Sequence, residues 1–74
     1  MGGNVDRLRV AVDEARARWE SELATLNAMI AMDVAAETPQ PELVEEQRKT
    51  VEAAQGVFNE AANAYLRALG GRGQ

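Results

Sequence analysis

Large apolar residues recur along the first half of the chain in steps of three and four positions. They are Val5, Leu8, Val12, Ala15, Trp19, Leu23, Leu26, Ile30 and Val34. Because these steps average about 3.6 residues, the period of an α-helix, they predict one long helix with an apolar side. Asn4 suits the N-cap and Asp6 the positive end of the helix dipole, so we expect this helix at about residues 4–36.

A second apolar stripe with the same spacing follows the two prolines of the chain. It consists of Val44, Gln47, Val51, Ala54, Phe58, Ala61, Tyr65 and Ala68, with Leu43, Val57, Ala62, Leu66 and Leu69 widening it. Pro41 suits the first helical position, where its missing N–H would be unpaired anyway, and Gly70 is a typical stop signal. We therefore expect a turn at 37–40, a second helix at about 41–69 and a flexible tail at 70–74.

Two helices of similar length joined by a short turn predict an all-α fold, the antiparallel two-helix hairpin. In that arrangement Trp19 lies beside Val57 and Phe58, and Leu26 lies beside Val51. So slender a hairpin leaves much of its apolar surface uncovered. We expect it to assemble into a four-helix bundle or a larger helical oligomer.

The composition points in the same direction. A chain of 74 residues forms one small domain, and such domains often need a disulfide, a metal or a partner chain to be stable. Cysteine and histidine are both absent, which excludes disulfides and removes the usual metal ligands. A further chain is the remaining source of burial, and a second copy of this chain is the partner we expect.

A row of small residues lies on the first helix, roughly opposite its main stripe. This alanine row comprises Val10, Ala17, Ser21, Ala24, Ala28, Ala31 and Ala35. Small residues let a neighbouring backbone approach closely, so the row is a candidate packing surface for another chain. The alternative is that alanine occupies exposed positions there for its helix propensity alone. If the row is an interface, a bulky charged residue at Ala24 or Ala28 should break association.

The residues expected to carry association fall into three groups. They are the large apolar residues Trp19, Leu23, Leu26, Ile30, Phe58 and Tyr65, the alanines Ala17, Ala24, Ala28 and Ala31, and the methionines Met29 and Met32 near the turn.

Charge is distributed unevenly along the expected hairpin, whose net charge is -4. The arginines Arg7, Arg9, Arg16, Arg18, Arg67 and Arg72 gather at the end that carries the termini. The acids Glu20, Glu22, Asp33, Glu37, Glu42, Glu45, Glu46 and Glu52 gather toward the turn. An antiparallel dimer would place each acidic end beside a basic one.

The sequence offers little for catalysis, cofactors or metals. Without histidine or cysteine the usual nucleophiles, bases and di-iron ligands are missing, so we expect no enzyme activity and no cofactor. The acidic balance and the lack of an aromatic stacking platform disfavour nucleic acid. The dimeric RNA-binding hairpins of plasmid copy-number control nevertheless share the expected shape, so RNA binding stays an alternative. No apolar run approaches the roughly 18 residues of a membrane span and no secretory signal is evident, so we expect a cytoplasmic protein.

The turn suggests a further alternative. The segment "TPQPELVEEQ" resembles the proline-bracketed turn of type III secretion needle subunits, over Pro39 to Gln47 only. Its prolines are closer together, and the C-terminus "YLRALGGRGQ" lacks the polymerising tail expected of those subunits. The resemblance implies a secretion-apparatus subunit or its small helical chaperone. More generally, a chaperone, inhibitor or structural subunit that binds a different protein, of the secretion, phage or toxin-antitoxin type, stays an alternative.

An acidic residue interrupts the apolar run before the turn, because Asp33 lies between Met32 and Val34. On an ideal helix Asp33 shares the side of Leu26 and Ile30. We hypothesise that its carboxylate accepts N–H bonds at the start of the second helix and fastens the turn. The exposed apolar tip would then consist of Met29, Met32 and Val34.

Overall fold

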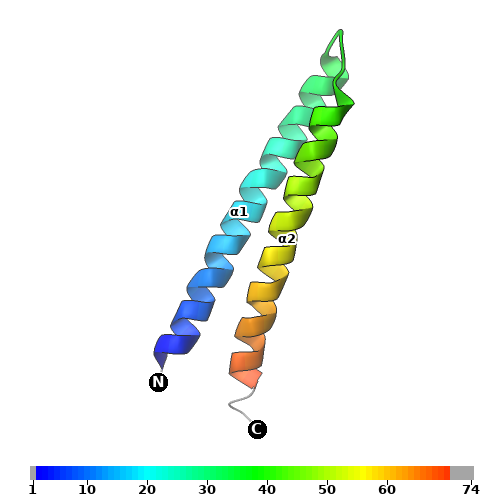
Figure 1. The fold of residues 1–74 in the computed structure, drawn as a ribbon. Helices are drawn as coiled ribbons and strands as arrows, with labels where there is room; N and C mark the ends of the chain where they lie inside the picture. Colours follow the sequence, from blue (N-terminus) through cyan, green and yellow to red (C-terminus); the bar gives the residue numbers. More distant parts are fainter. Residues whose placement is uncertain (1, 71–74) are drawn as a thin grey trace.

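The computed structural model describes residues 2–70 and contains two helices. Helix α1 spans Gly2–Ala35 and helix α2 spans Pro41–Gly70. The helices run antiparallel, side by side along their whole length, with the turn at one end and the outer ends of both helices at the other (Figure 1). The all-α, antiparallel two-helix hairpin predicted from the sequence is confirmed. Each observed helix end lies within two residues of the expected one, and residues 71–74 of the expected tail lie outside the described part.

The connection between the helices is short and is held by backbone hydrogen bonds. At the end of α1 the Ala36 N–H donates to the carbonyl oxygen of Asp33 at 3.2 Å. At the start of α2 the Leu43 N–H donates to the carbonyl oxygen of Gln40 at 3.1 Å. Gln40 is therefore the N-cap, and Pro41 occupies the first helical position, where no N–H is needed.

The core is a thin seam between the two helices. Leu26, Val51 and Ala54 are the buried side chains within the described residues, with exposed fractions of 9%, 7% and 6%. Nearer the open end, Trp19 stacks on Phe58 with ring centroids 5.8 Å apart and an angle of 9° between the ring planes. Both rings are half-buried. The expected pairing of Trp19 with Phe58 is confirmed, although neither ring is fully enclosed.

Two residues expected near the seam lie at its edge. Val57, which we expected beside Trp19, is 58% exposed. Adjacent helix positions are rotated by about 100°, so the placement of Phe58 in the seam turns Val57 out of it. Ile30 is 42% exposed. A helix with a single neighbour buries only a narrow stripe, and Ile30 falls beside that stripe.

The hairpin exposes more surface than a compact protein of its mass. It measures 58 × 15 × 13 Å along its principal axes, and its accessible surface is 5587 Å². A compact monomer of 8.0 kDa would expose about 4,400 Å². The large apolar side chains left exposed are Val10, Ile30, Met32, Val34, Leu43, Val57, Leu66 and Leu69. The hairpin thus has roughly 1,100 Å² more accessible surface than a compact monomer of its mass.

Candidate interaction surface

One side of the hairpin is lined by two rows of residues spaced seven apart. The rows are Ala11, Arg18, Thr25 and Met32 on α1, and Leu43, Thr50, Val57 and Ala64 on α2. Seven residues make nearly two helical turns, so each row stays on one side of its helix. We call these eight residues the groove face. Arg18 is its one charged member, and all eight are exposed or only partly covered.

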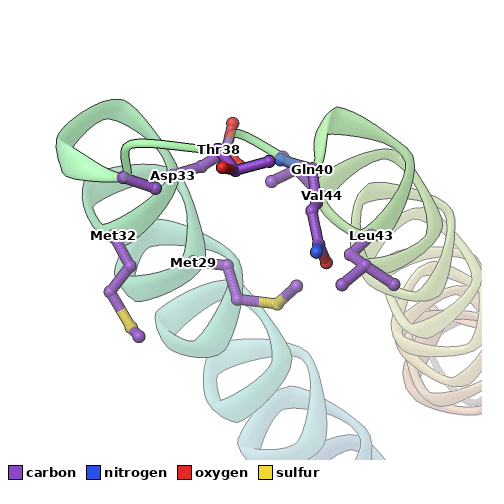
Figure 2. A pocket seen from close by; sticks show the side chains of 8 residues that line it. Met29, Met32, Asp33, Thr38, Gln40, Leu43 and Val44 are labelled. Carbon is purple, nitrogen blue, oxygen red and sulfur yellow. The ribbon is translucent and has the colours of Figure 1, made fainter.

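At the turn end, the groove face contains a shallow hollow of about 240 Å³. It is lined by Met29, Met32, Asp33, Ala36, Thr38, Gln40, Leu43 and Val44. Figure 2 shows Met29 from α1 and Leu43 from α2 extending toward each other across the space between the helices. Ligand pockets usually enclose about 300–1,000 Å³, so this tip hollow suits a protein side chain better than a small molecule.

The expected apolar tip is only partly exposed. Met32 and Val34 are 71% and 82% exposed, as the hypothesis required. Met29 instead is half-buried, because it reaches back over the tip hollow toward α2. The three residues therefore do not form one continuous exposed patch.

A second hollow of about 220 Å³ lies halfway along the groove face. It is lined by Ala15, Arg18, Thr50, Ala53, Ala54 and Val57. Half of these lining residues are alanines, while Val57 has more than half of its surface exposed. In knobs-into-holes packing, a side chain of one helix fills a hollow between side chains of the facing helix. An exposed valine next to a hollow that contains three alanines suits this kind of packing.

The opposite side of the hairpin, which we call the polar side, carries the ion pairs found within the described residues, although Val34 and Leu66 are exposed there as well. Arg16 Nε lies 3.8 Å from Glu20 Oε1 on α1. On α2, Arg48 bonds to Glu45 and, through Nη1 at 2.5 Å, to Glu52. The hydrogen bonds from Arg48 hold the pKa of Glu45 below its usual value. These exposed ion pairs add little stability. Their charged groups are solvated, so the polar side does not need a partner to cover it.

A partly buried hydrogen-bond pair links the helices across the seam. The Gln47 Nε2 amide donates to the Glu22 carbonyl oxygen and to Glu22 Oε1, both at 2.9 Å. Gln47 occupies a core position in the apolar stripe, and this link explains why an amide is tolerated there. It helps fix the register in which α2 lies against α1.

The turn is fastened by the carboxylate that interrupts the apolar run. Asp33 Oδ1 accepts a hydrogen bond from the backbone N–H of Gln40 at 2.6 Å. This confirms the hypothesis that Asp33 caps the start of the second helix.

We expect Asp33→Ala to lower the free energy of unfolding by about 1 kcal/mol, the usual effect of losing a capping acceptor. Urea unfolding followed by circular dichroism measures the change. Glu37→Ala removes a nearby exposed carboxylate for which no bond is seen, and it is the matched control. Asp33→Asn keeps an acceptor oxygen and should lose less. Equal stability of Asp33→Ala and the wild type would contradict the capping role.

The structure separates the predicted interaction residues into groups that do not meet. Trp19, Leu23, Leu26, Phe58 and Tyr65 lie in or beside the seam and are half-buried or buried. Ala17, Ala24, Ala28 and Ala31 are exposed on the outer side of α1. Because the seam residues are occupied within one hairpin, surfaces free for a partner are the groove face and the alanine row.

The fold defines this protein as an antiparallel α-helical hairpin. Comparisons with protein-family models, curated proteins and solved structures found no match to the chain. Across residues 2–70, neither helix is long and apolar enough to cross a membrane. The same residues contain no group of three acidic side chains placed to hold a metal ion.

Proposed function

We propose that this protein is a non-enzymatic assembly module that self-associates through its apolar helix surface, as a homodimer or a larger helical oligomer. The observation that carries the proposal is the thin core, with three buried side chains in the part of the chain that the structure describes. Domains of this size seldom gain enough stability from one core alone. The extra exposed surface of roughly 1,100 Å² exceeds the ~800 Å² that each partner buries in a standard interface.

The two sides of the hairpin favour the groove face as the associating surface. Its rows carry one charge among eight residues, whereas the polar side carries three ion pairs. Burying the polar side would remove charged groups from water at a high energetic cost. Burying the groove face would cover Met32, Leu43 and Val57, which are among the most exposed apolar side chains.

Sedimentation equilibrium at micromolar concentration tests self-association. We expect a mass of twice 8.0 kDa or a higher multiple, together with a thermal midpoint that rises with protein concentration. A monomer that remains helical and unfolds cooperatively at the same concentrations would overturn the proposal.

A second candidate is a module that binds a different helical protein, such as a chaperone, inhibitor or structural subunit. The methionine lining of the tip hollow favours it, because methionine side chains adapt to varied partners. In that case the isolated chain should be monomeric and poorly packed, and should become ordered only with its partner. In either case we propose a cytoplasmic protein, as the sequence led us to expect.

A further inference from the structure

We propose that a second copy of this chain docks antiparallel on the groove face, with the turn end of each hairpin beside the open end of the other. The inference rests on the proposed self-association and adds the face, the orientation and the register. Three features of the surface carry it: side-chain size, charge and the position of the central hollow.

Larger and smaller side chains alternate along both rows of the groove face, and both rows begin with a large one at the turn. On α1 the row runs from Met32 at the turn to Ala11 at the open end. On α2 it runs from Leu43 at the turn to Ala64. A parallel dimer would oppose large residues at one end and leave a gap between alanines at the other. An antiparallel dimer opposes large with small along the whole face, which is how close-packed interfaces fill space.

Charge selects the same orientation. Within the described residues, the turn half (20–55) has two cations and eight acids, a net charge of -6. The open half (2–19 and 56–70) has five cations and four acids, a net charge of +1. A parallel dimer would place the two -6 halves together. An antiparallel dimer places each -6 half beside a +1 half, which avoids like-charge repulsion.

The central hollow places the two-fold axis. The α2 row is centred between Ala53 and Ala54, and both residues line the hollow. An axis crossing the hairpin there pairs Leu43 with Ala64 of the partner copy and Val57 with the partner copy's hollow. Because the knob and the hollow belong to the same surface, one rotation satisfies both copies at once, as a two-fold interface requires. The groove face is thus self-complementary.

Disulfide cross-linking tests this arrangement cleanly, because the natural chain has no cysteine. Leu43→Cys and Ala64→Cys are each made alone, mixed, and oxidised mildly; covalent dimers are separated on a non-reducing gel. In an antiparallel dimer residue 43 of one copy lies beside residue 64 of the other, so we expect covalent dimer from the mixture. Two copies of residue 43 would lie about 31 Å apart, the length of 21 helical residues, so neither variant should cross-link by itself. Asn59→Cys, exposed on the polar side, is the matched control and should stay monomeric on the gel.

The outcomes separate the inference from the proposed function. If the wild-type chain sediments as a monomer, the proposed self-association is wrong, and the docking mode fails with it. A wild-type dimer in which Leu43→Cys cross-links to itself is parallel, and one in which only Asn59→Cys cross-links uses the other side. A wild-type dimer that yields none of these products uses a different surface, and one that dissociates on Ala28→Arg but keeps its mass with Val57→Arg uses the alanine row of α1. Each of these overturns the docking mode, whereas the 43–64 product alone supports it.

Discussion

Replacing Val57 with arginine is expected to convert the oligomer into folded monomers. In the single hairpin Val57 is 58% exposed, so the new side chain reaches water and the fold survives. Arginine is also a better helix former than valine, so helix content should not fall. In the proposed dimer, however, the arginine would enter a hollow whose lining includes Arg18 and contains no acid to pair with. Two unpaired charges would then be buried, one from each copy.

The magnitude of this effect should be large. Burying an uncompensated charge costs several kcal/mol, so even partial burial at ~3 kcal/mol raises the dimer dissociation constant more than a hundredfold. Sedimentation equilibrium over a range of concentrations measures the constant, and circular dichroism checks the helix content. Asn59→Arg adds the same charge to the polar side of the same helix and should leave the mass unchanged. An unchanged mass for Val57→Arg would show that association does not use the groove face.

The fold was predictable because its signals are local. Two stripes with a period of about 3.6 residues and a proline at the first position of the second helix place the helices within two residues of their observed ends. The capping role of Asp33 was predictable as well, because a carboxylate in an apolar run near a helix start has few other uses. The register followed from the antiparallel topology, which brings Trp19 to Phe58.

The groove face was not predicted, and the reason is geometric. A search for large apolar residues passes over Thr25, Thr50 and Ala64, which complete the two rows at seven-residue spacing. Sequence spacing also shows only that α2 is apolar over a wide arc. Whether Val57 lies in the seam or outside it depends on how α2 is rotated against α1. The bond between Gln47 and Glu22 depends on the same rotation, so it too appears only in the structure.

Replacing Trp19 with alanine is expected to remove about half or more of the stability of the isolated hairpin at 25 °C. The Trp19–Phe58 stack is its aromatic contact, and the truncation removes both the stack and the apolar area it covers. Truncating a buried tryptophan costs about 3–5 kcal/mol, so a half-buried one should cost about 2–3 kcal/mol. A single small core seldom supplies more than about 3–5 kcal/mol in total, so the variant retains little margin. Thermal unfolding by circular dichroism measures the loss.

Trp19→Phe keeps an aromatic ring against Phe58 and should retain most of the stability, which makes it the matched control. Phe58→Leu breaks the same stack from the other helix while leaving the single tryptophan as a fluorescent reporter. If association supplies stability as proposed, raising the concentration of Trp19→Ala should restore part of its helix content, because binding favours the folded state. A midpoint of Trp19→Ala within a few degrees of the wild type would show that the aromatic stack does not hold the hairpin together. If the helix content of Trp19→Ala does not change with protein concentration, association does not stabilise the fold.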